Sequence, residues 1–170
     1  RAIAEADEAL SIPDLEVVAP AGAAEARQAR GVGKIYRQDD EGAIRDLEAA
    51  IVLARRAGSK RIEAIVHSSL AVGHQRAGRS AEARRSYDDA IAAAEAAGDA
   101  AGVATARLNL GTLEWADGDL ARAITEFEAA ADLARRVMRL STLERALINL
   151  AIVDLGLGRY ARVANTLKSL

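Results

Sequence analysis

The strongest constraint on this chain is a phrase of sequence that returns every 40 residues. Residues 118–130 read GDLARAITEFEAA, and residues 78–90 read GRSAEARRSYDDA one period earlier. Residues 41–50 (EGAIRDLEAA) keep the pattern, and residues 158–160 begin it again. A fixed period of this length indicates stacked structural repeats, each of which buries its apolar face against its neighbours.

The composition of the repeats favours helix. Hydrophobic residues make up 51% of the chain, most of them Ala and Leu, while aromatic residues make up only 3%. Ala and Leu are strong helix formers, and the aromatic residues that favour strands are scarce. The sequence therefore predicts an all-α protein, a right-handed superhelical solenoid of antiparallel helix pairs.

Each period is predicted to hold two helices joined by a short turn. In the unit 101–140, Asp99 is the expected N-cap and Gly118-Asp119 the turn. Ser141-Thr142-Leu143-Glu144 has the pattern of a capping box that would open the last unit. Pro20 suits the first turn of a helix. The nine expected helices lie near 1–11, 21–38, 41–57, 61–77, 81–97, 101–117, 121–138, 141–157 and 160–170.

The organisation along the chain follows from the same period. Residues 1–20 are interpreted as the second helix of a truncated preceding repeat and a linker. Residues 21–170 are interpreted as the array, with units 21–60, 61–100, 101–140 and 141–170. Because residue 1 is Arg and the sequence stops within a helical pattern, we expect the chain to be a piece of a longer protein.

Small residues recur at two positions of the period. Gly111 lies on the first helix of its unit and Ala123 on the second, and both positions hold small residues in most other units. Small side chains allow paired helices to approach closely. We therefore predict that Gly111 and Ala123 lie at a close contact between helices, with Phe127 filling the space beyond.

The motif resembles the tetratricopeptide repeat (TPR). The resemblance is carried by Asn109-Leu110-Gly111 and by Gly118 to Phe127, and it covers about residues 21–170. The 40-residue period is similar to the long-helix class, which includes Pins-type adaptors, kinesin light chains and the sensor arrays of large bacterial regulators. The chain departs from the family at the aromatic position of the first helix, which here holds Lys34, His74, Glu114 and Asp154.

The resemblance implies a binding surface, because in this family the first helices line a concave groove that holds a peptide. Asn109 and Asn149 occupy one position of the period, and an amide both donates and accepts hydrogen bonds, so each could hold a peptide backbone. Alternatively, both amides satisfy helix ends or neighbouring side chains. Trp115 is either a groove anchor or a packing residue, with packing favoured. The expected peptide-binding residues are Ser69, Gln75, Arg76, Arg107, Asn109, Thr112, Trp115, Arg145, Asn149 and Ile152.

Other classes of function find no support in the sequence. The net charge of −2 gives no electrostatic argument for nucleic acid or an anionic membrane. No apolar run approaches the roughly 20 residues that span a bilayer. Cysteine is absent, and no catalytic constellation, metal-ligand spacing or phosphate loop appears. We expect no enzyme activity, no cofactor and no metal site, and a cytoplasmic location.

The leading hypothesis is therefore a protein-interaction scaffold whose partner is a protein or peptide, as a regulatory or sensor part of a larger bacterial protein. The alternative is a self-assembly module, a homo-oligomer that pairs through apolar faces exposed at the ends of the array.

Overall fold

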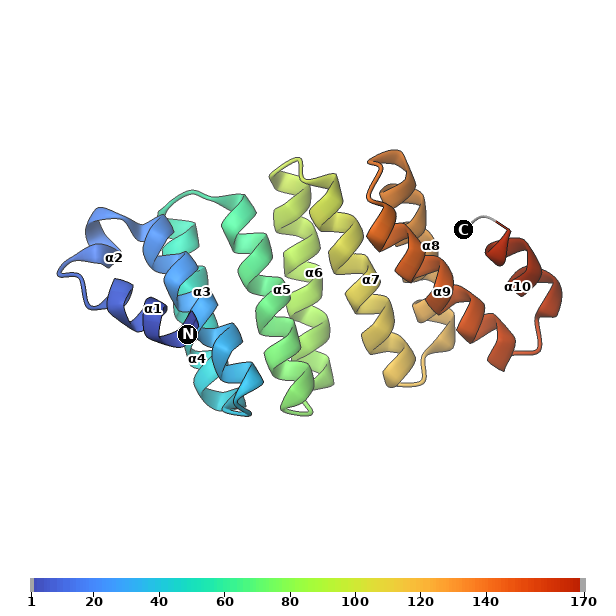
Figure 1. The fold of residues 1–170 in the computed structure, drawn as a ribbon, viewed down its shortest axis with the longest axis horizontal. Helices are drawn as coiled ribbons and strands as arrows, with labels where there is room; N and C mark the ends of the chain where they lie inside the picture. The colour runs from blue at the N-terminus through green and yellow to red at the C-terminus, as the bar shows by residue number, and fades with distance from the viewer. Residues whose placement is uncertain (1, 169–170) are drawn as a thin grey trace. The chain divides into compact units, whose positions relative to one another are not determined.

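The computed structural model describes residues 2–168, which form ten α-helices and no strand within that range (Figure 1). The chain divides into two compact units, Arg1–Gly98 and Asp99–Leu170. The first unit holds α1 (Ala2–Leu10), α2 (Leu15–Val18), α3 (Pro20–Tyr36), α4 (Asp40–Arg56), α5 (Lys60–Arg76) and α6 (Ser80–Ala96). The second holds α7 (Ala100–Ala116), α8 (Leu120–Arg136), α9 (Leu140–Gly156) and α10 (Tyr160–Leu167).

The all-α prediction is confirmed, and a helix lies near each of the nine expected positions. Residues 1 and 169–170, which fall in the first and last expected helices, lie outside the described residues. The tenth helix, α2, was not expected. It is a single turn that follows the left-handed residue Asp14 (φ 56°) in the predicted linker, and it packs against α3.

The helix starts show which capping predictions hold. The Asp99 carboxylate accepts a hydrogen bond from the backbone N–H of Gly102 at 2.9 Å, and α3 begins at Pro20, as predicted. The capping box at residues 141–144 is wrong, because α9 begins at Leu140 and Arg139 provides no side-chain cap. Arg139 lies one period after Asp99, so the repeated turn geometry, rather than the Ser141 hydroxyl, fixes where this helix starts.

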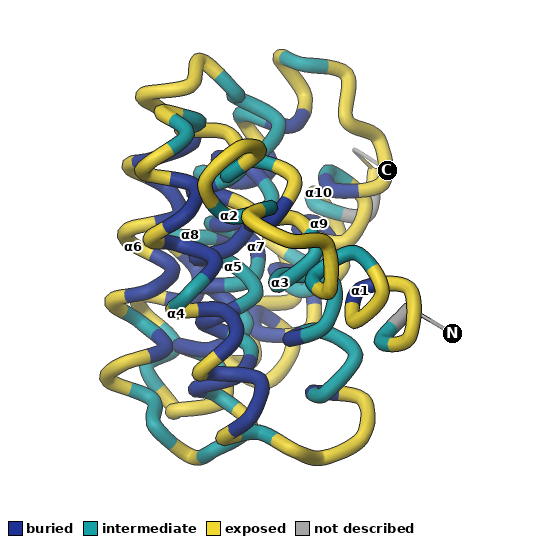
Figure 2. Tube along the Cα trace, turned by 90° about the vertical axis from the view of Figure 1, so that its left-hand side faces the viewer, coloured by how far each residue is buried: buried dark blue, intermediate teal, exposed yellow. Residues whose placement is uncertain are grey.

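Each unit is built from antiparallel helix pairs whose apolar faces meet. In the first unit α3 pairs with α4 and α5 with α6, α4 packs against α5, and α1 and α2 cover α3. In the second unit α7 pairs with α8, and α9 packs against both α8 and α10. Figure 2 shows buried stretches of helices such as α4 and exposed positions at the turns. Alternate burial along each helix is what an amphipathic pattern with a helical period produces.

The predicted close contact lies between α7 and α8. Gly111 and Ala123 are both buried, and a Cβ atom added to Gly111 would lie 2.7 Å from Cδ1 and Cε1 of Phe127 and 3.3 Å from the carbonyl oxygen of Ala123. The aromatic ring therefore occupies the space that the glycine lacks. The pair formed by α3 and α4 repeats the arrangement, since a Cβ atom at Gly31 would lie 2.8 Å from Cγ of Leu47.

The turns between paired helices need a left-handed residue. Gly118 has φ +86°, a conformation that glycine adopts without a steric penalty. Gln38 (φ 64°) takes this place two periods earlier, in the turn between α3 and α4, and Met138 (φ 57°) is the left-handed residue of the turn that joins α8 to α9. A side chain in this region costs roughly 1–2 kcal/mol, so these two turns carry backbone strain.

We predict that Met138→Gly stabilises the protein by about 1 kcal/mol, because it removes the strain at this turn. Met138 is 76% exposed, so little apolar packing is lost. Urea unfolding followed by circular dichroism measures the change in the free energy of unfolding. Met138→Ala is the control, and it should give no gain because its Cβ atom keeps the strain. Equal gains from both substitutions would show that the Met138 side chain, rather than its backbone, is the cause.

We predict that Ala123→Leu lowers the free energy of unfolding by about 1–3 kcal/mol, because a larger side chain overpacks the contact with Gly111. Ala121 lies on the same helix and is exposed, so Ala121→Leu is the matched control and should change stability little. Thermal unfolding of the two variants tests this, and an unchanged melting temperature for Ala123→Leu would contradict the close packing of α7 on α8.

Candidate binding face

The first helices of the second unit, α7 and α9, contact one another directly. Asn109 on α7 and Asn149 on α9 occupy the same position of the 40-residue period, and both are half-buried. Among the described residues, neither amide makes a side-chain hydrogen bond. We call the exposed surface of α7 and α9 around these two residues the binding face.

The α9 side of this face combines apolar and positive groups. Ile148, Ile152 and Leu155 are 39%, 44% and 54% exposed, although they lie on the same helix as the half-buried Asn149. Arg145 is exposed and has no ion pair within residues 2–168. The face therefore offers amides for a backbone, a cation for a carboxylate and apolar area for side chains.

Three residues expected on this face are engaged within the unit. The guanidinium of Arg107 donates to Oε2 of Glu126 on α8 at 3.0 Å. The Thr112 hydroxyl donates to the carbonyl oxygen of Leu108 at 3.0 Å. Trp115 is half-buried and packs against the apolar core of the unit, the environment that sequence reasoning favoured for it. These three side chains are therefore less free to meet a partner than Asn109 and Asn149.

The other three expected residues lie on α5 in the first unit. The Ser69 hydroxyl accepts a hydrogen bond from Nε2 of Gln28 at 3.0 Å and donates one to the carbonyl oxygen of Ile65 at 3.1 Å. Arg76 donates to Oδ1 of Asp40 at 3.0 Å. Gln75 is half-buried, and its amide has no hydrogen bond among the described residues. Seven of the ten expected residues therefore lie on α7 and α9 of the second unit, and the other three lie on α5 of the first unit.

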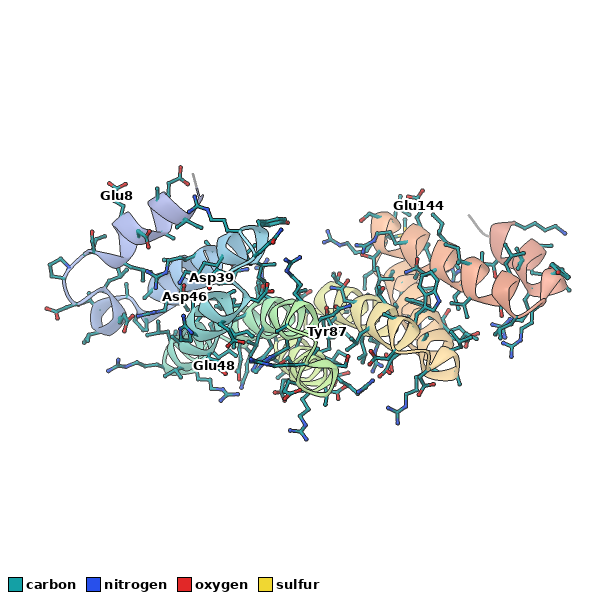
Figure 3. All side chains as sticks on the ribbon, turned by 90° about the horizontal axis from the view of Figure 1, so that it is seen from below. Glu8, Asp39, Asp46, Glu48, Tyr87 and Glu144 are labelled. Atoms are coloured by element: carbon teal, nitrogen blue, oxygen red, sulfur yellow. The ribbon has the colours of Figure 1, made fainter. Side chains whose placement is uncertain are left out.

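A charged cluster that sequence reasoning missed links α3 to α4. Asp46, which Figure 3 labels, is buried. It accepts hydrogen bonds from Arg30 at 2.6 and 2.8 Å and lies 2.8 Å from Nζ of Lys34. Burial alone would raise the pKa of Asp46, but the hydrogen bonds from Arg30 and Lys34 lower it below its usual value. Asp46 therefore stays ionised and ties the two helices together.

The register of the repeats could have revealed such pairs. A guanidinium nitrogen of Arg27 lies 3.5 Å from Oδ1 of Asp46. Two periods later, the equivalent positions hold Arg107 and Glu126, which also form an ion pair. Both pairs are separated by 19 residues. A cation on the first helix and a carboxylate 19 residues later is the sequence signal for an ion pair across the helix pair.

The position of the first helix that holds an aromatic residue in the tetratricopeptide repeat holds polar residues in this chain, and they lie inside the helix pairs. His74, Glu114 and Asp154 are all buried, and Lys34 is half-buried. Asp154 pairs with Nε of Arg162 at 3.0 Å, and Lys34 pairs with Asp46. These positions contribute to the contact between paired helices rather than to the binding face.

Two kinds of site receive no support from the described residues. No three His, Cys, Asp or Glu side chains there gather in a way that could hold a metal ion. No helix within residues 2–168 combines the length and apolarity that crossing a bilayer requires.

Comparison with known proteins identifies relatives by fold alone. The sequence matches no protein-family profile and no curated protein. BtubC (BKLC) from P. vanneervenii superposes with a TM-score of 0.82 at 18% identity, over 98% of this chain and 68% of that one. A Rap protein complexed with Competence and Sporulation Factor gives 0.79 at 17% identity, over 96% of this chain and 45% of that one.

A third structure carries the repeat family in its description. A putative kinesin light chain from Podosopora anserina with nearly identical TPR-like repeats gives a TM-score of 0.73 at 12% identity, over 98% of this chain and 82% of that one. This chain spans less than half of the length of the Rap protein. The helix pairs, the small-residue contacts and these superpositions agree, and the chain has the fold of the TPR-like helical-repeat proteins.

Proposed function

We propose that this chain is a protein-interaction scaffold whose binding face, on α7 and α9, holds an extended segment of a partner protein. The observation that carries the proposal is the pair of half-buried amides, Asn109 and Asn149, which repeat in register and have no partner among the described residues. An extended peptide needs partners for its backbone N–H and C=O groups, and an amide side chain satisfies either.

The surroundings of the amides define the partner further. Arg145 would attract an acidic side chain or a terminal carboxylate. Ile148 and Ile152 would cover apolar side chains of the bound segment. We therefore expect a partner segment with an acidic group near one or two aliphatic residues. The first unit offers a separate candidate contact surface on α5, where Gln75 has no hydrogen bond among the described residues and Ser69 and Arg76 would have to exchange their internal bonds.

The similar structures support a scaffold in general terms. One of them is a Rap protein in complex with Competence and Sporulation Factor, so a related fold does hold a partner. We extend this to a regulatory or sensor role within a larger bacterial protein in the cytoplasm. The proposal is a binding role, with no catalytic step and no cofactor.

A second candidate function is self-assembly. Ile148 is 39% exposed, whereas Leu108, one period earlier, is fully buried in the core that α9 helps to form. The α9 face therefore has the apolar character of a helix that another helix could cover. A second copy of the chain is the alternative occupant.

We predict that Asn109→Ala combined with Asn149→Ala weakens partner binding and leaves the helices intact. Peptides selected from a randomised phage-displayed library on the unaltered protein serve as the probe, and isothermal titration gives their affinity. Each lost contact is worth about 1 kcal/mol, so the pair raises Kd roughly 30-fold. Asn165 is exposed on α10, and Asn165→Ala is the matched control.

Two results would contradict this assignment. Unchanged affinity in the double variant, with normal helicity by circular dichroism, would reject a role for the amides in binding. Light scattering that rises with protein concentration, together with selection of no peptide, would favour self-assembly. In that case Ile148→Glu should restore the monomer, because a buried unpaired charge is costly at an apolar interface.

A further inference from the structure

A cavity of about 170 Å³ lies in the first unit, between the end of α4, the first half of α5 and the C-terminal half of α6. It contains none of the residues assigned to the binding face. Its wall combines charged side chains, Arg55, Lys60, Glu63 and Asp89, with His67 and three alanines of α6. A small polar cavity of this kind is a candidate for a small-molecule site.

The imidazole of His67 is the most unusual group in the wall. The residue is 5% exposed, and both ring nitrogens are buried without a hydrogen-bond partner among the described residues. Nε2 lies 3.9 Å from Oε1 of Glu63, and Nδ1 lies 3.8 Å from Oδ2 of Asp89. Both distances are too long for hydrogen bonds. Buried polar atoms are nearly always paired in native proteins, so two orphaned nitrogens beside a cavity point to a ligand that pairs them.

The charges of the cavity are separated into two sides. Nε of Arg55 and Nζ of Lys60 donate to the buried carboxylate of Glu63 at 2.8 and 2.7 Å. Both cations are more than half exposed and keep further N–H groups. On the opposite side, the carboxylate of Asp89 is 61% exposed, and within residues 2–168 it lies within 4.0 Å of no basic side chain other than His67. The four charges cancel, and the neutral imidazole lies between the two sides.

His67 stays neutral because of its surroundings. Burial lowers its pKa below the usual value, and the nearby cations Arg55 and Lys60 act in the same direction, whereas Asp89 and Glu63 oppose them. A neutral imidazole offers one N–H donor and one acceptor nitrogen to the cavity.

Comparison of the repeats shows that the residues that form the cavity are particular to the repeat 61–100. Ala93 of α6 corresponds to Leu53 on α4 and to Leu133 on α8. Leu53 is buried in the apolar core of its own helix pair. Glu63 corresponds to apolar Ala23, Val103 and Leu143. The repeat 61–100 therefore has the small Ala93 where two other repeats have leucine, and the buried charge of Glu63 where the others have an apolar residue. Packing alone does not require this combination.

We propose that this cavity binds a small zwitterion of the size of a small α-amino acid. Its carboxylate pairs with the free N–H groups of Arg55 and Lys60, and its ammonium group pairs with Asp89. His67 contacts the ligand between these two ends, and a short aliphatic side chain lies on the alanines of α6. A neutral cavity with separated charges favours a ligand that carries both charges, because a simple anion or cation would leave one side unpaired.

Titration of the whole chain with L-alanine tests this, with the imidazole carbon-bound protons observed by NMR. The chain has two histidines, so His74 is an internal reference. The expected result is a saturable shift of the His67 signals with the His74 signals unchanged. Acetate and methylammonium carry one charge each, and their affinity should be at least about tenfold lower than that of L-alanine, because each loses a charged hydrogen bond.

Two substitutions complete the test. Ala93→Leu fills the cavity with the residue that two other repeats use, and it should abolish the shift. Ala81, exposed on the same helix, gives the control Ala81→Leu, which should bind normally. Asp89→Asn keeps the shape of an exposed side chain and should weaken binding about tenfold even if Ala93→Leu fails to fold. No saturable shift of His67, equal binding of acetate, or full binding by a folded Ala93→Leu variant would each overturn the proposal.

Discussion

The close approach of the two helices in a pair is the contact on which the rest of each unit depends. At Gly111 the backbone of α7 leaves room for the ring of Phe127, which is fully buried. The same fit joins Gly31 to Leu47 in the first unit. Because the second helix fills the space against one side of the first, the first helix presents its opposite side to solvent or to the next first helix. The exposed surface of α7 and α9, for which we propose a binding role, is left uncovered because the second helices pack on the opposite side.

The period of the sequence predicted this interlock because it repeats the residues that make it. Helix positions, the small-residue contact and the cap at Asp99 all follow from local patterns that recur. The capping box at Ser141 failed because two local signals competed there. The turn with its left-handed Met138 fixes the start of α9 at Leu140, and the Ser141 hydroxyl, three residues after Met138, cannot shift a helix held by its neighbours.

The candidate site was less predictable because it depends on partners far along the chain. The sequence suggests that Arg107 is available to a ligand, but Glu126, 19 residues later, accepts a hydrogen bond from it across the helix pair. Asn109 and Asn149 were found because they repeat, yet only the structure shows that neither amide has an internal partner among the described residues. The cavity beside His67 depends on nitrogen–oxygen separations of 3.8 and 3.9 Å, where about 2.9 Å would have made ordinary hydrogen bonds. No sequence pattern resolves that difference.

The polar residues at the consensus aromatic position have a different role from the apolar core. Lys34 pairs with Asp46 on α4, whereas Asp154 pairs with Arg162 on α10, so the same position carries opposite charges in two helix pairs. Buried ion pairs add little net stability compared with apolar packing, because desolvation offsets much of the attraction. These ion pairs do strongly disfavour incorrect pairing of helices, since α3 placed against α10 would bring Lys34 toward Arg162.

Repeats that share their apolar residues need such differences, because their apolar cores alone would allow the helix of one pair to pack in another. The charges at this position therefore differ from one helix pair to another, while the contacts of Gly31 with Leu47 and of Gly111 with Phe127 give two pairs the same close packing.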